Sequence, residues 1–290
     1  MMPEGPDAMK RSATSTATGA LRQGSAPGPL LSPAVPPDRT APAADRMPHI
    51  LRRLKKAYPD ARIALQFTNG LQCLIAVMLS AQTTDEQVNR VTSILFEKYR
   101  EPSDYLRARE EDLQKDIYAT GFFRQKTRSL RGMCQALIEK HDGQVPKTMK
   151  ELIALPGVAR KTANIVLGNV YPEAARKDPD YGIAVDTHVG RIAVRLGLTS
   201  WNSKEAVGIE RDLLQLVPKR DWYRLSYLFI EHGRRTCIAK RPLCESCPVE
   251  SLCPSSQEAG LPDLFRTTAK QGGRAARSPA PRSRRKVTRS

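Results

Sequence analysis

The sequence lacks any long apolar run and is short of acidic residues. Its longest apolar stretch, residues 74–79, is far below the ~20 residues of a membrane span. Its first residues contain no apolar segment like that of a secretory signal. We therefore expect a protein that is neither membrane-bound nor secreted. The 290 residues include 47 Lys and Arg against 30 Asp and Glu, a formal net charge of +17, which favours a polyanion as partner.

Two segments have too few apolar residues to form a core. Residues 1–45 are rich in Pro, Ala, Ser, Thr and Gly, and residues 258–290 add many basic residues to a similar composition. Such segments cannot bury enough apolar surface to offset their ordering entropy, so both are predicted to be disordered tails. Two interpretations of the basic tail stay open: attraction to nucleic acid without sequence reading, or a merely solvated segment.

Between the tails, apolar residues recur at helical spacing, and no stretch alternates with the period of a strand. We therefore predict an all-α fold of about nine or ten helices. Asn69 or Thr68 is a candidate N-cap, and Thr148 with Glu151 has the pattern of a capping box. The predicted helices cover residues 50–57, 71–87, 88–99, 112–120, 126–141, 148–155, 159–170, 186–196, 203–215 and 222–236.

Four of the six cysteines lie close together near the end of the predicted folded region. They are Cys237, Cys244, Cys247 and Cys253, with the spacing C-x6-C-x2-C-x5-C. Four thiolates this close in sequence can bind one soft metal centre, whereas disulfides are disfavoured in a protein that is not exported. The spacing favours a [4Fe–4S] cluster, with zinc as the alternative. Cys73 and Cys134 occur singly in helical patterns and are expected in the core.

The loop between the first two of these cysteines contains Lys240 and Arg241. A loop held by a metal centre can present both cations to phosphate groups of a nucleic acid. Surface charges that only serve solubility are the alternative.

Residues 155–161, LPGVARK, indicate two helices joined by a tight turn. Pro156 cannot extend the first helix, and Gly157 gives the backbone the freedom that a tight turn needs. The unpaired N–H groups of the second helix, which begins near Ala159, can hold a phosphate. This is the pattern of a helix-hairpin-helix, although an ordinary helix connection is the alternative. Lys161 stands where a cation opposes the helix dipole, a local conflict that often marks a functional site.

Residue type alone leaves the roles of three polar residues open. Lys161 by itself is a better candidate for a phosphate contact than for a nucleophile. Asp186 follows an apolar run and opens a predicted helix, so its type favours an N-cap. His188 is expected to pack in the protein or to contact a phosphate rather than to catalyse.

Four elements of this chain occur together in one family. They are LSAQTTD at 79–85, LPGVARKTAN at 155–164, VDTH at 185–188 and the four-cysteine loop. Together they resemble endonuclease III, of the helix-hairpin-helix DNA glycosylase superfamily, over residues 48–257.

The resemblance implies two helical domains that flank a DNA-binding cleft. One is a six-helix barrel over residues 63–180, which contains the helix-hairpin-helix. The other is a [4Fe–4S] domain, which combines the first helix, 46–62, with residues 181–257.

The resemblance also implies a bifunctional DNA glycosylase and AP lyase of base excision repair. The substrate is duplex DNA with an oxidised or damaged pyrimidine or an abasic site. Lys161 matches the nucleophile that forms a Schiff base and nicks the strand by β-elimination, and Asp186 matches the catalytic carboxylate. Because the damaged base must leave the stack, Gln82 looks like the residue that fills its space, and Phe122 resembles the apolar wedge. Further DNA contacts are expected from Leu155, Gly157, Ala159, Arg160, His188, Lys240 and Arg241. The family also implies a monomeric, cytoplasmic protein, associated with the nucleoid of a bacterium.

The chain departs from the family pattern at three places. Ala159 stands where glycine is usual, Phe122 replaces an aliphatic wedge, and residues 171–181 are longer than the usual connection, so we expect them to loop out. A purine-mismatch glycosylase is disfavoured, because residues 74–79 contain no acid and Lys161 is present. A thymine-mismatch or pyrimidine-dimer glycosylase and a non-catalytic DNA-binding module stay open, and a cluster-based electron carrier is weaker.

Overall fold

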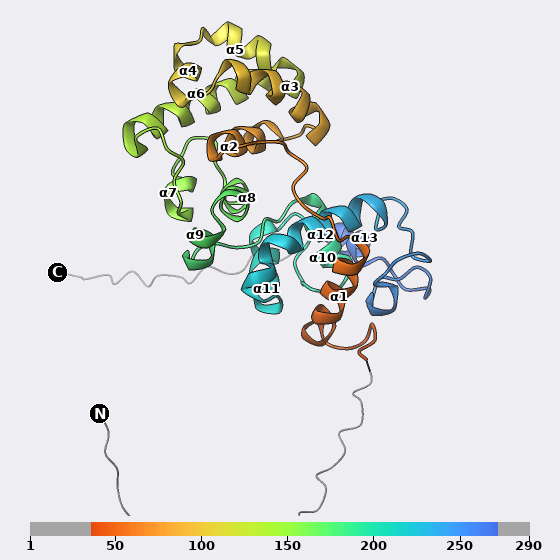
Figure 1. Cartoon of the computed structure of the whole chain (residues 1–290). Helices are drawn as coiled ribbons and strands as arrows, with labels where there is room; N and C mark the ends of the chain where they lie inside the picture. Colours follow the sequence, from red (N-terminus) through yellow and green to blue (C-terminus); the bar gives the residue numbers. More distant parts are fainter. Residues whose placement is uncertain (1–35, 272–290) are drawn as a thin grey trace, which may run out of the picture. The chain divides into compact units, whose positions relative to one another are not determined.

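Helices make up the regular structure of residues 36–271, the part of the chain that the computed structural model describes (Figure 1). No strand occurs in this range, which confirms the all-α prediction. Contacts divide the chain after Pro36, and every element below belongs to the unit that begins at Pro37. The α-helices are α1 (Ala43–Ala57), α2 (Gly70–Leu79), α3 (Asp85–Lys98), α4 (Pro102–Arg107), α5 (Glu110–Ile117), α6 (Phe123–His141), α7 (Met149–Ile153), α8 (Arg160–Val170), α9 (Pro172–Lys177), α10 (Thr187–Arg195), α11 (Ala206–Leu216), α12 (Trp222–Arg235) and α13 (Leu264–Gln271). Three 3-10 helices are η1 (Tyr118–Thr120), η2 (Lys219–Asp221) and η3 (Glu250–Leu252).

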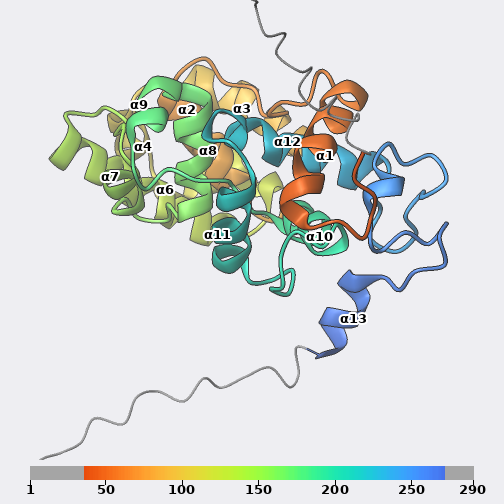
Figure 2. The same cartoon turned by 90° about the horizontal axis from the view of Figure 1, so that it is seen from below.

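Buried apolar side chains form two clusters. The first runs from Leu65 to Tyr181 and centres on α2, which is buried from Cys73 to Leu79 and packs on α6 and α8. The second joins α1 to α10, α11, α12 and η3, and α1 contacts α11 and α12 despite the sequence between them (Figure 2). The division into domains over 63–180 and over 46–62 with 181–257 stays a prediction, which the two clusters support.

The first predicted helix pair is divided differently from the expectation. Asn69 caps α2 by accepting a hydrogen bond from Gln72 N, which confirms one of the two expected caps. The helix ends at Leu79 rather than at residue 87, and Thr84 caps α3 at Asp85. The predicted helix 71–87 runs through the turn between α2 and α3. Apolar spacing alone does not reveal where the backbone leaves the helical conformation.

Short helices account for most of the difference between the expected nine or ten helices and the thirteen described. The expectation that residues 171–181 loop out is wrong, because they contain α9. Ala175 of α9 is buried, and Asp178 accepts a hydrogen bond of 2.6 Å from Met149 N at the start of α7. A helix held by one small apolar residue and one polar contact leaves no periodic signal in the sequence.

The inner edges of both predicted tails are helical. Residues 43–45 belong to α1, and α13 lies within 258–290, so the prediction of disorder is wrong for these residues. Residues 36–42 and 258–263 of the predicted tails are described without a helix, and residues 1–35 and 272–290 lie outside the described residues. Polar contacts hold both edges. Buried Arg46 donates to the carbonyls of Leu196 and Leu252 at the first edge, and Asp263 pairs with Arg195 at the second. No helix between residues 36 and 271 has the length and apolar character to cross a bilayer.

Candidate active site

The turn between α7 and α8 is shaped by one glycine. Gly157 has φ of +76°, and a Cβ there would lie 2.8 Å from Ser129 Cβ and 3.0 Å from Met78 Cε. The positive φ and the lack of room for a Cβ both require glycine at this position. Ala159, by contrast, has φ of −89° and ψ of 165° as N-cap of α8, a conformation that alanine adopts without strain. Alanine in place of the expected glycine is therefore tolerated, and no side chain makes a capping hydrogen bond at the N-terminus of α8.

Lys161 and Asp186 line the same pocket. Lys161 lies in the first turn of α8, and Asp186 immediately precedes α10. The pocket lies where the two apolar clusters meet, because Val77 of the first and Ile230, packed on the second, both line it. Lys161 is exposed and Asp186 is half-buried, so a substrate group can reach both.

Asp186 is the N-cap of α10, as its residue type predicts. Its Oδ1 accepts hydrogen bonds of 2.8 Å from both His188 N and Val189 N. Within residues 36–271, Oδ2 accepts no hydrogen bond. One oxygen therefore orients the carboxylate while the other stays available for chemistry, so the cap and a catalytic role are compatible.

His188 packs beside the same pocket. Burial lowers the pKa of His188, Asp186 opposes that shift, and the cations of Arg191, Arg234 and Lys161 reinforce it. The imidazole is therefore neutral at neutral pH. Its Nδ1 lies 3.2 Å from Arg191 Nη2, so part of its hydrogen-bonding capacity is used inside the protein.

Two of the expected DNA contacts turn inward. The side chain of Leu155 belongs to the first apolar cluster, so this residue can meet DNA only through its backbone. Arg160 donates to Glu210 at 2.8 and 3.1 Å and to Asp180 O at 2.8 Å. The DNA contacts expected from Leu155 and Arg160 stay predictions, for Leu155 through its backbone and for Arg160 through a side chain that is still 40% exposed. Asn164 belongs to the same hydrogen-bonded cluster, because it donates to Glu210 and accepts from Gly182 N.

A second pocket brings together three predicted DNA contacts from separate turns. Gln82, Phe122 and Gly157 all line it. Gln82 and Phe122 are exposed and have φ of +55° and +48°, the left-handed region that non-glycine residues rarely adopt. Strained backbone at exposed residues is typical of functional sites, which supports the interpretation of this edge as the part that enters DNA.

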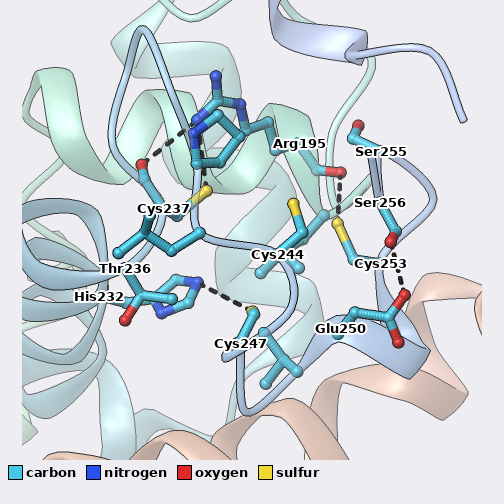
Figure 3. A pocket seen from close by; sticks show the side chains of 14 residues that line it. Arg195, His232, Thr236, Cys237, Cys244, Cys247, Glu250, Cys253, Ser255 and Ser256 are labelled. Atoms are coloured by element: carbon cyan, nitrogen blue, oxygen red, sulfur yellow. Dashed lines mark hydrogen bonds between the residues drawn. The ribbon is translucent and has the colours of Figure 1, made fainter. Parts of the chain in front are cut away.

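The four cysteines of the C-x6-C-x2-C-x5-C loop surround one pocket (Figure 3). None of them forms a disulfide. Burial raises the pKa of Cys247 and of Cys253 to about 12, so these thiols need a metal centre to become thiolates at neutral pH. No group of three or more ligating side chains in the described residues is placed to hold a single metal ion.

Two buried residues border this pocket. Arg195 Nη1 donates to Cys237 Sγ at 3.4 Å and to Ile238 O at 2.8 Å. His232 Nε2 lies 3.9 Å from Cys247 Sγ (Figure 3), and burial lowers the pKa of His232 to about 4, so its ring is neutral. Hydrogen bonds of this kind orient thiolate ligands and tune a metal centre.

Comparisons with known proteins give the same assignment. Residues 75–219 match the HhH-GPD superfamily of base excision DNA repair proteins. Endonuclease III of Synechocystis sp. is 43% identical over 219 residues, which are 76% of this chain and 96% of that protein.

The chain belongs to the endonuclease III family.

Two solved endonuclease III structures agree with this membership. A non-covalent endonuclease III–DNA complex and a trapped covalent endonuclease III–DNA intermediate each give a TM-score of 0.69 at 40% identity. Each comparison covers 75% of this chain and 98% of the other. As a member of the endonuclease III family, the chain is a DNA glycosylase and AP lyase of base excision repair.

Sequence reasoning missed two residues of this endonuclease III-type site. Lys126 lines the pocket of Gln82 and Phe122 but is buried, and a lysine in a helix is usually interpreted as a surface residue. Asp263, which pairs with Arg195, lies within the predicted tail. Only the apolar Leu261, Leu264 and Phe265 around Asp263 could have indicated an ordered segment there.

Proposed function

We propose that this chain removes oxidised or ring-damaged pyrimidines from duplex DNA, with Lys161 as nucleophile and Asp186 as catalytic carboxylate. The proposal depends on one observation: these two residues, 25 positions apart in the sequence, line the same pocket. Arg62 and Arg234 line it too, and such cations favour the phosphates beside a flipped nucleotide.

The chemistry uses one amine and one carboxylate. Lys161 Nζ, after losing its proton, attacks C1′ of the deoxyribose, the bond from C1′ to the base breaks, and the base leaves. Opening of the sugar ring then gives a Schiff base between Nζ and C1′. The Schiff base acidifies the C2′ proton, and its loss expels the 3′ phosphate and nicks the strand. Asp186 Oδ2 is suited to stabilise the positive charge at the sugar and to transfer protons.

Binding of the duplex is assigned to residues around this pocket. The N-terminus of α8, His188, Lys240 and Arg241 are proposed to contact phosphates, since helix N-termini and basic side chains hold them without reading sequence. Lys240 and Arg241 are exposed on the loop between Cys237 and Cys244. Gln82 and Phe122 are proposed to fill the space of the flipped base. A related endonuclease III has been solved in complex with DNA, which supports DNA as the partner, and we propose that the chain binds it as a monomer.

A [4Fe–4S] cluster is proposed as the group held by the four cysteines. The pocket among them fits it, because four thiolates can each bind a different iron of one cluster. The cluster would fix the loop that presents Lys240 and Arg241. Four irons and four acid-labile sulfides per chain, with visible absorption, are expected for the purified protein. A colourless protein with one zinc per chain would assign zinc instead.

Borohydride trapping on an abasic duplex tests the nucleophile. The wild type is expected to form a covalent adduct, and Lys161→Ala is not. Lys115→Ala is the matched control, because that side chain is 78% exposed on α5 and lies outside both pockets. Absence of an adduct with the wild type would favour a non-catalytic DNA-binding module.

A panel of lesions tests the substrate. Duplexes with an oxidised pyrimidine, a thymine mismatch or a pyrimidine dimer should be compared by the rate of base release at equal protein concentration. Fastest excision of the oxidised pyrimidine is expected. Preference for the mismatch or the dimer would contradict the proposed substrate while leaving Lys161 in its role.

A further inference from the structure

Lys126 is a buried lysine with every proton of its ammonium group paired. Its Nζ donates to Leu79 O at 2.7 Å, to Thr83 Oγ1 at 3.0 Å and to Thr120 O at 2.7 Å. Lys126 is 8% exposed. An ammonium has three donors and no acceptor, so three acceptors satisfy it completely and leave no lone pair on the nitrogen.

The three acceptors belong to two different turns. Leu79 and Thr83 flank the turn that contains Gln82, and Thr120 ends η1 two residues before Phe122. Thr83 Oγ1 also donates to Thr120 O, so the two turns are joined directly as well. The side chain from α6 therefore holds together two segments that are separated by about 40 residues, a separation that no local interaction could fix.

Both turns contain strained backbone that needs such support. Gln82 and Phe122 are two of the three non-glycine residues with positive φ between residues 36 and 271. A non-glycine residue keeps a positive φ only when contacts with its surroundings hold it in that conformation. Lys126 is the charged group that contacts both turns, and it lines the pocket between Gln82 and Phe122.

We propose that Lys126 is a positioning residue, which holds Gln82 and Phe122 in the conformations and at the separation needed to enter duplex DNA together. The inference rests on the proposed roles of these two residues. Burial lowers the pKa of Lys126 to about 8, which still leaves most of the amine charged at neutral pH. Lys126 lines a different pocket from Lys161 and Asp186, so its proposed role differs from that of Lys161.

The test measures unstacking separately from chemistry. A duplex with a tetrahydrofuran abasic analogue and 2-aminopurine opposite it reports the displaced base by its fluorescence. Lys126→Met and Thr83→Val should each lower the amplitude at saturating protein by about tenfold, because released strain lets the turns relax. Thr83→Val is the milder variant for folding: it removes one acceptor of Lys126 and the direct hydrogen bond to Thr120 O from a half-buried site, and it leaves Lys126 two acceptors.

Thr127→Val is the matched control. Thr127 neighbours Lys126 on α6, is fully buried, and its hydroxyl has no hydrogen-bond partner in the structure. This variant should keep the wild-type amplitude. An unchanged amplitude in folded Thr83→Val and Lys126→Met would overturn the inference.

Borohydride trapping separates this inference from the proposed function. On an abasic strand with a one-nucleotide gap opposite the site, no partner base needs displacing, so Thr83→Val and Lys126→Met should trap within about threefold of the wild type. An adduct on Lys126 in the Lys161→Ala variant would contradict the positioning role. Failure of the wild type to trap would overturn the proposed function instead, whatever the fluorescence shows.

Discussion

Arg195 and Asp263 form an ion pair of 2.8 Å whose side chains are only 2% and 7% exposed. The pair ties α10 to the segment that precedes α13, and Arg195 also donates to three carbonyls of residues 237–239. Phe265 covers the guanidinium at 5.2 Å. The C-terminal segment therefore closes over the first residues of the cysteine loop.

Asp263→Ala is expected to lower the free energy of unfolding by about 3 kcal/mol, because it leaves a buried guanidinium without its counter-charge. Urea unfolding measures the loss. Arg266→Ala is the control: this side chain is 51% exposed and also pairs with Asp263, so its removal should change the stability by less than about 0.5 kcal/mol. Equal effects of the two variants would contradict the structural role of the buried pair.

The two oxygens of Asp186 should be separable by mutation. Asp186→Asn keeps an oxygen that can accept from His188 N and Val189 N, whereas Asp186→Ala removes the cap and should cost about 1 kcal/mol of stability. Both variants lose the carboxylate, so excision should fall by about a hundredfold or more in each. Thermal unfolding and single-turnover rates provide the two readouts. Normal excision by Asp186→Asn would leave Asp186 as a cap alone.

Arg160 and Lys240 should differ in how they affect the salt dependence of DNA binding. Lys240→Ala removes a proposed phosphate contact and should reduce the slope of log K against log salt by about one. Arg160→Ala should leave that slope unchanged and lower the stability by about 1–2 kcal/mol, because Glu210 then stays largely buried without a counter-charge and keeps only Asn164 as a donor. Binding titrations at several salt concentrations distinguish the two. A reduced slope in Arg160→Ala would return that residue to the DNA interface.

Phe122→Gly should separate stability from activity. Glycine adopts the left-handed conformation of residue 122 without strain, and Phe122 is 60% exposed, so little packing is lost. The variant should be as stable as the wild type or more stable by up to about 1 kcal/mol. Its excision rate should fall, because no ring remains to hold the gap open. Undiminished excision would show that Phe122 is not the wedge.

The sequence best predicted those features that depend on residues close to one another in the chain. The cap at Asn69 and the turn at Gly157 depend on residue types that act on neighbouring backbone, so position alone indicates them. Lys161 and Asp186 were identified through a family motif, since nothing in their residue types brings α8 and α10 together. Their common pocket is a property of the fold.

The features that sequence could not predict depend on distant polar contacts. Arg195 and Asp263 are 68 positions apart, and neither lies in a periodic pattern that marks it as buried. Lys126 is interpreted as a surface residue until Leu79, Thr83 and Thr120 are placed around it. Hydrophobic periodicity reports which face of a helix is buried, and it carries no information about a charge that is buried because its hydrogen bonds are complete.

One hydrogen-bonded cluster joins α8, the helix that bears Lys161, to the chain just before Asp186. It consists of Arg160, Asn164, Gly182 and Glu210. A Cβ at Gly182 would lie 1.9 Å from Glu210 Oε1, so even alanine would push these partners apart. These four residues therefore act as a spacer, which sets the start of α8, with the proposed nucleophile Lys161, relative to the residues just before the proposed carboxylate Asp186.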